Sequence, residues 1–196
     1  MKFPSRLRAS FPLDFYGNRT ACVTSGDAFE SLDGYILIFH EFIHCSQWES
    51  CELRIKQNLG IAQKAAAEKN DMWELNHPFP FDKEKFRDNY SSLLLAWEAN
   101  NASEFFKLRK ELKRTLSQDD FEYMVWQEWK EGFARFIENK IRNKLDVEEN
   151  HFGRGEPSSR IAFYEGGAAF IEFLTSRQPS LLEDIESLFY RMMNKD

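Results

Sequence analysis

Two histidines four residues apart could bind a single metal ion. His40 and His44 enclose Glu41 in the pattern His-Glu-x-x-His. In a helix this spacing is about one turn, so both imidazoles point the same way and can share one zinc ion. Glu41 lies at the edge of that face, where its carboxylate can take a proton from a zinc-bound water without binding the metal itself. The motif therefore predicts a catalytic zinc site on a helix.

The motif lies in an apolar stretch of the chain. Residues 35–39 read Tyr-Ile-Leu-Ile-Phe, and Phe42 and Ile43 lie within the motif. A helix that is apolar nearly all round is expected to be buried. Each buried histidine or glutamate without a partner would cost about 1–3 kcal/mol. We therefore expect a buried helix whose polar groups are satisfied by a metal ion and its water.

Glu131 is the candidate for the third ligand that a catalytic zinc ion needs. It precedes Gly132 and Ala134, and a glycine within a helix costs about 1 kcal/mol relative to alanine. A close approach to another helix would explain these small residues. Glu128 lies three residues earlier on nearly the same face and is the alternative ligand. Glu138, two turns further on, could accept a hydrogen bond from the second ring nitrogen of a ligand histidine.

The motif at 40–44, followed by Glu131-Gly-x-Ala, resembles the gluzincin metallopeptidases. In that family a glutamate on a later helix completes the zinc site. A third segment, residues 164–174, resembles the Tyr-x-x-Gly-x-x-Phe helix of such peptidases, so the resemblance covers roughly residues 34–190. It implies a zincin-like helical domain, one zinc ion per chain bound by His40, His44 and Glu131, and a peptide or protein substrate.

Two residues are candidates for stabilising an oxyanion. The resemblance implies that Tyr164 donates a hydrogen bond to the tetrahedral intermediate, as a phenol can where negative charge develops. His151 lies in a glycine-containing loop and could serve the same purpose. Glu41 would take the proton of the attacking water and return it to the leaving amine.

Two other functions fit the same residues. Glu-x-x-His pairs at 41–44 and 74–77, with Glu128 and Glu131, match the ligand types of di-iron carboxylate bundles. Pro78 disfavours helical geometry beside the second pair, and the first histidine of the motif would then have no role. The third possibility is a non-catalytic protein that uses a metallopeptidase-like scaffold for binding.

The periodicity of the chain predicts a mainly α fold (α+β) with a small N-terminal β hairpin. Residues 14–16 and 19–24 flank a Gly-Asn turn, as in a hairpin. Helical patterns cover 35–59, 61–69, 83–100, 103–117, 118–145, 160–176 and 180–193, with a loop at 146–159. We expect one domain over residues 1–196: a β element (1–33), the active-site helix region (34–69), a helical hairpin (83–117), and the third-ligand and closing helices (118–196).

Composition narrows the compartment and the partners. A chain of 196 residues with 19 phenylalanines can bury one sizeable core. The net charge of −6 disfavours nucleic acid and anionic membranes as partners. The longest apolar run is far shorter than a membrane span, and no apolar stretch follows the first residues as in a secretory signal. Three cysteines fit a reducing compartment, so a cytoplasmic location is expected.

Overall fold

The computed structural model describes residues 7–155 and 157–194. These residues form a mainly helical fold with one two-stranded antiparallel sheet, which confirms the fold class predicted from the sequence. In this part of the chain, no helix is long and apolar enough to cross a membrane. The elements are β1 (Arg8–Leu13), β2 (Arg19–Thr24), α1 (Leu32–Gln47), α2 (Leu53–Asn58), α3 (Gly60–Ala67), α4 (Trp73–Asn76), α5 (Glu84–Glu98), α6 (Ala102–Thr115), α7 (Gln118–Lys144), α8 (Ala162–Arg177) and α9 (Ile185–Asn194).

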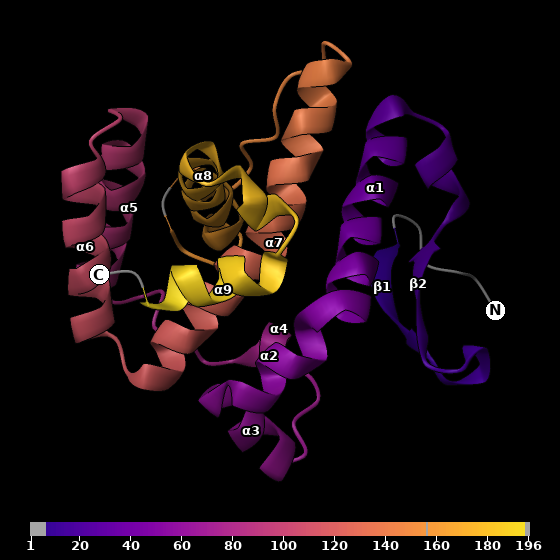
Figure 1. The fold of residues 1–196 in the computed structure, drawn as a ribbon, viewed down its shortest axis with the longest axis horizontal. Coiled ribbons are helices and arrows are strands. Elements are labelled where there is room, and N and C mark those ends of the chain that lie inside the picture. The colour runs from indigo at the N-terminus through magenta and orange to yellow at the C-terminus, as the bar shows by residue number, and fades with distance from the viewer. Residues whose placement is uncertain (1–6, 156, 195–196) are drawn as a thin grey trace.

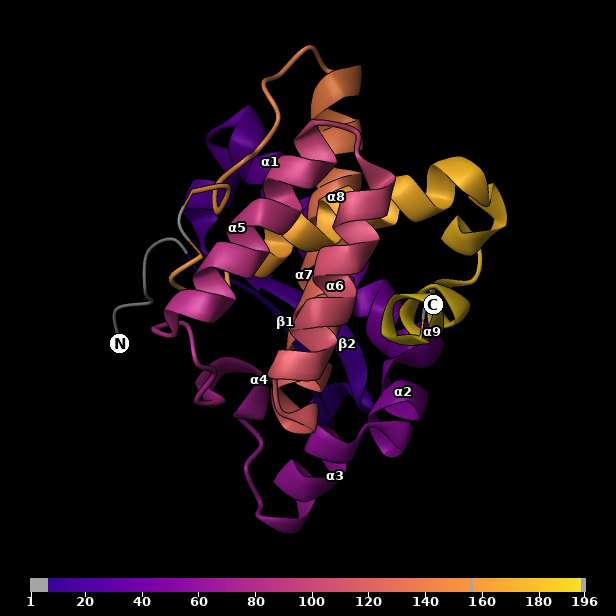
Figure 2. The same ribbon diagram turned by 90° about the vertical axis from the view of Figure 1, so that its left-hand side faces the viewer.

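Helix α7 lies at the centre of the fold and packs against both α1 and α8 (Figure 1). Ser117 caps its N-terminus, because its hydroxyl accepts a hydrogen bond from the backbone N–H of Asp120. Trp126 and Trp129 of α7 are fully buried. The predicted hairpin of α5 and α6 covers the side of α7 and α8 that faces away from α1 (Figure 2). The core thus holds α7 firmly between the helices that flank it.

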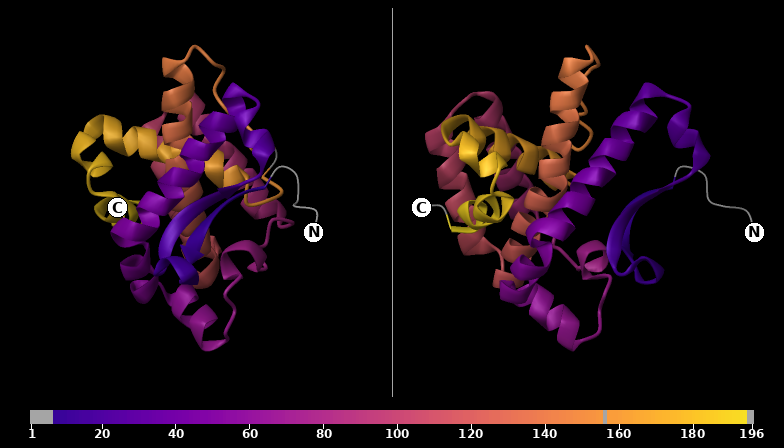
Figure 3. Two further views of the ribbon diagram at one scale, coloured as in Figure 1. Left: turned by 90° about the vertical axis from the view of Figure 1, so that its right-hand side faces the viewer. Right: turned by 45° about the vertical axis from the view of Figure 1, so that its right-hand side comes forward.

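The β hairpin flanks α1 on its outer side (Figure 3). Its turn contains Gly17 and Asn18, both with positive φ (67° and 57°), as the Gly-Asn pair predicts. The first strand was predicted wrongly, because residues 14–16 form a 3-10 turn and the strand is Arg8–Leu13. Pro12 obscures this strand in the sequence. It is tolerated because, among the described residues, β1 pairs with β2 along one edge alone.

Helix α1 is not buried all round, and this expectation was wrong. Tyr35, Phe39 and Phe42 are 47%, 51% and 50% exposed. The buried face of α1 instead carries the two histidines of the motif, which are 7% and 8% exposed. These positions are four residues apart, so they share the side of α1 that packs against α7. The buried face of the helix is therefore its polar one, and α7 must supply the partners.

The end of the chain departs from the predicted helix over 180–193. Pro179–Leu182 form a 3-10 turn, and α9 begins only at Ile185. The carboxylate of Asp184 accepts hydrogen bonds from the backbone N–H and the hydroxyl of Ser187. This local capping starts the helix later than its apolar pattern suggests.

Gly132 makes a close helix contact, but its partner is α8 and not the helix of the histidine motif. A Cβ atom at Gly132 would lie 2.6 Å from Cα of Gly167. Side chains larger than hydrogen at this crossing would push α8 away from α7. The contact brings the start of α8, including Tyr164, beside the side chain of Glu131.

Candidate metal centre

His40, His44 and Glu131 converge between α1 and α7. Oε2 of Glu131 lies 3.6 Å from Nε2 of His40 and 3.4 Å from Nε2 of His44. One ligand atom from each residue lies within 4.8 Å of the other two. In a tetrahedral zinc site, ligand atoms about 2 Å from the metal are about 3.3 Å from one another. The observed spacing fits such a site with little movement of the side chains.

A glutamine fixes the orientation of the His44 ring. The side-chain N–H groups of Gln47 donate to the backbone carbonyls of Trp129 and Lys130 at 3.3 and 3.1 Å. The amide oxygen of Gln47 must therefore face Nδ1 of His44, which lies 2.9 Å away. Nδ1 then donates its hydrogen, so the lone pair is on Nε2 and points toward Glu131. This is the tautomer that a metal ligand requires.

A buried carboxylate fixes the ring of His40. Nδ1 of His40 lies 3.1 Å from Oε2 of Glu138, as proposed from the spacing along α7. The other oxygen of Glu138 accepts hydrogen bonds from Arg142 at 3.0 Å and Asn150 at 2.8 Å. A carboxylate behind a ligand histidine sets the direction of the ring and increases its basicity. Both imidazoles are thus held from behind with Nε2 toward the centre.

The electrostatics of the centre favour a cation. Burial by itself lowers the pKa of His40, but hydrogen bonds and charge from Glu131 and Glu138 outweigh burial and raise the pKa to about 9. Burial by itself raises the pKa of Glu131, but the neighbouring imidazoles hold it well below its usual range. Positive charge at this point is therefore stabilised on both sides, whether a proton or a metal ion carries it.

Glu41 faces the same cavity as the three converging residues. This cavity has a volume of about 720 Å³ and is lined by α1, β1, α7 and the start of α8. Glu41 lines it next to His40 but does not belong to the group whose ligand atoms converge. A carboxylate beside the metal position that is not itself a ligand is placed to exchange protons with a water or a substrate there.

Tyr164 also lines this cavity. Its hydroxyl oxygen accepts a hydrogen bond from Nη1 of Arg160 at 2.9 Å, and its phenolic hydrogen can be donated to the neighbouring carboxylate of Glu131. Burial, together with the charge of Glu131, raises the pKa of Tyr164, so the phenol keeps its proton. Nη1 of Arg160 also lies 3.6 Å from Oε1 of Glu131. Tyr164 and Arg160 thus both lie beside Glu131 at the metal position.

Two candidate residues are not brought to this centre. His151 lies outside the cavity, with its ring nitrogens 2.9 Å from Glu165 and 3.3 Å from Glu149. Glu128 instead contacts α5 and α6, where Tyr90 donates to it at 3.0 Å and Arg109 at 2.7 Å. Of the two glutamates considered as third ligand, only Glu131 reaches the histidines. The two glutamates are three residues apart on α7, and the rotation of α7 about its axis decides which of them faces α1.

The second Glu-x-x-His pair is also separated from the centre. Glu74 accepts hydrogen bonds from Trp126 and Lys130, and His77 lies 2.8 Å from a carboxylate oxygen of Asp120. Among the described residues, one group of three or more potential ligands converges, and neither member of this pair belongs to it. In the described part of the chain, this pair therefore does not join the converging residues in a shared cluster of ligands.

Two residues that support the centre, Gln47 and Arg160, are not among the candidates of the sequence analysis. Gln47 lies three residues after His44 on the same helix, a spacing at which a side chain can reach the preceding turn. Arg160 lies four residues before Tyr164 and lines the cavity. Attention to positions one turn from each candidate residue would have found both.

No protein family, curated protein or solved structure matches this chain. A function is therefore inferred from the geometry and chemistry of the centre.

We expect Glu138→Gln to weaken zinc binding by about 10–100-fold, because the amide holds His40 with a weaker hydrogen bond and no charge. Titration against a zinc chelator measures the change. Glu172→Gln is the matched control, since Glu172 is exposed on α8 and pairs with Lys140. A folded Glu138→Gln protein with unaltered zinc affinity would show that Glu138 does not support the metal ligand.

Proposed function

We propose that this chain is a zinc-dependent hydrolase that cleaves peptide bonds. The observation that carries the proposal is the position of Glu131, whose Oε2 lies within 3.6 Å of Nε2 of both motif histidines while Glu41 lines the same cavity. Three protein ligands of this type leave one tetrahedral position open, which distinguishes catalytic from structural zinc sites. A zinc ion held there would acidify a bound water and polarise a substrate carbonyl.

The residues around the centre can perform the proton transfers of hydrolysis. Glu41 accepts the proton of the attacking water and delivers it to the leaving amine, so the same carboxylate acts first as base and then as acid. Tyr164 donates its phenolic hydrogen to the oxyanion that develops on the substrate. Arg160 holds the phenol in place through its hydrogen bond to the phenolic oxygen.

Strand β1 offers a binding edge for an extended peptide. Arg8, Ala9, Ser10 and Phe11 all line the cavity. A substrate backbone that adds to this edge would gain main-chain hydrogen bonds while its scissile carbonyl reaches the metal position. This supports a peptide, and not a small ester or nucleotide, as the substrate class.

Removal and restoration of metal tests the proposal. The purified protein is expected to cleave members of a diverse peptide mixture, to lose this activity with a zinc chelator, and to regain it with one equivalent of zinc. Mass spectrometry of the products and metal analysis of the protein provide the measurements. A protein that holds zinc but cleaves no peptide would favour the non-catalytic binding function, and two irons per chain would favour the di-iron site.

A further inference from the structure

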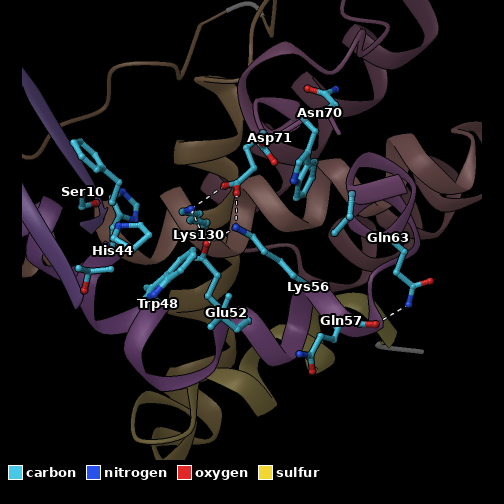
Figure 4. A pocket seen from close by; sticks show the side chains of 18 residues that line it. Ser10, His44, Trp48, Glu52, Lys56, Gln57, Gln63, Asn70, Asp71 and Lys130 are labelled. Carbon is cyan, nitrogen blue, oxygen red and sulfur yellow. Dashed lines mark hydrogen bonds and ion pairs between the residues drawn. The ribbon is translucent and has the colours of Figure 1, made fainter. Parts of the chain in front are cut away.

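A second cavity, with a volume of about 850 Å³, adjoins the cavity of the metal centre (Figure 4). It lies between the β hairpin, the end of α1, α3 and the segment that leads into α4. The two cavities share His44, Phe11 and Lys130 in their walls. A group in the second cavity could therefore belong to the same molecule as a group at the metal position.

Aromatic, small and uncharged polar residues form the sides of the second cavity, the polar ones including Gln57, Gln63 and Asn70. Phe11 comes from β1, Trp48 from the turn after α1, and Trp73 from α4. Trp73 is 7% exposed and is braced by the ring of Trp126, whose centroid is 5.7 Å away. Ala66 of α3, which is exposed, also lines the cavity, and its small side chain leaves room for a ligand there. These walls offer apolar surface to a bound group.

The charged side chains at the floor of the second cavity form ion pairs with one another. Nζ of Lys56 lies 2.7 Å from both Glu52 and Glu74, and Nζ of Lys130 lies 3.1 and 2.8 Å from the same two carboxylates. Figure 4 shows the two lysines side by side above Glu52. Although burial raises the pKa of Glu74, the two lysines outweigh it and lower the pKa to about 2. Two positive and two negative charges thus satisfy one another.

A charged ligand would gain little from this floor. It would give up its hydration and find every ammonium and carboxylate of the floor already paired. The other ionisable residues in the wall are His44, which faces the metal centre, and Asp71, which is exposed. An uncharged apolar group loses no hydration of this kind and gains contact with the aromatic walls.

We propose that the second cavity binds a large apolar side chain, aromatic or aliphatic, of the peptide whose scissile bond lies at the metal centre. This specificity rests on the proposed function, because the metal centre places the peptide. The cavity then selects which peptides are cleaved.

Hydroxamate probes test this selection. Zinc-loaded Glu41→Gln protein is titrated with the N-acetyl hydroxamates of phenylalanine, glycine and lysine, which share the zinc-binding group and differ in the side chain. We expect the phenylalanine probe to bind about tenfold or more tightly than the other two, as burial of a phenyl ring implies. Ala66→Trp, which fills the cavity, should reduce this preference to less than about threefold. Ala67→Trp is the matched control, because Ala67 is exposed on the same helix and does not line the cavity.

A second measurement separates the cavity from the metal. Binding of N-acetyl-phenylalaninamide and N-acetylglycinamide to metal-free protein is followed by saturation-transfer NMR. The aromatic amide should bind preferentially, and Ala66→Trp should abolish its signal. Equal affinity for all three hydroxamates, tighter binding of the lysine probe, or an unchanged preference in Ala66→Trp would overturn the proposed specificity. Failure of every hydroxamate while the aromatic amide still binds would overturn the zinc site and support the apolar cavity.

Discussion

Glu41→Gln is expected to lower the rate of peptide hydrolysis by about 10²–10⁴-fold while the protein keeps its zinc ion. The amide has the shape of the carboxylate but cannot take a proton from water. Glu41 lines the cavity without belonging to the converging ligand group, so the metal should remain. Turnover of a cleaved peptide and the zinc content of the same sample provide the two measurements.

The control for this substitution is Glu104→Gln. Glu104 lies on α6, on the far side of the molecule from α1, and its carboxylate contacts Lys107. This variant should retain the activity of the unaltered protein. If Glu41→Gln were as active as the unaltered protein, Glu41 would not be the base. If Glu41→Gln lost its zinc, Glu41 would be a ligand.

Substitution of Glu131 and of Glu128 on α7 should affect different properties, zinc affinity in the first case and stability in the second. Glu131→Gln is expected to weaken zinc binding by more than about 100-fold, beyond the loss from a residue behind a ligand, since it removes the only carboxylate oxygen of the converging group. Glu128→Gln should leave zinc affinity unchanged but lower the free energy of unfolding by about 3–5 kcal/mol, because the guanidinium of Arg109 is left buried without its charge partner.

Zinc titration and thermal unfolding of both variants separate these effects. The melting temperature of Glu128→Gln should still rise on addition of zinc, because binding to the folded state stabilises it. The melting temperature of Glu131→Gln should respond far less. A zinc response lost in Glu128→Gln and retained in Glu131→Gln would reverse the assignment of the third ligand.

The residues of the centre could be predicted from the sequence because, within each helix, they follow the spacing of helical turns. His40 and His44 share one helical face wherever the helix packs, and Glu131 to Glu138 spans two turns of a second helix. Glu138, which holds the ring of His40 from behind, could be proposed for the same reason. Which of Glu128 and Glu131 faces α1 could not be predicted, because a rotation of α7 by less than one turn exchanges them.

Other features depend on packing between distant segments. Periodicity could not show that the aromatic residues of α1 face outward, because helix α1 is apolar on several sides and its contacts with α7 and the β hairpin select its buried face. The close contact of Gly132 was predictable, but its partner Gly167 was not. The second cavity requires β1, α3 and α4 to meet, and no local pattern encodes that meeting.

Anomalous diffraction above the zinc absorption edge, from crystals of the zinc-loaded protein, tests the metal centre most directly. We expect one strong peak per chain, about 2.0–2.2 Å from Nε2 of His40, Nε2 of His44 and a carboxylate oxygen of Glu131. No peak at this position in a protein that carries zinc, or a peak ligated by other residues, would contradict the metal centre and the hydrolase inferred from it.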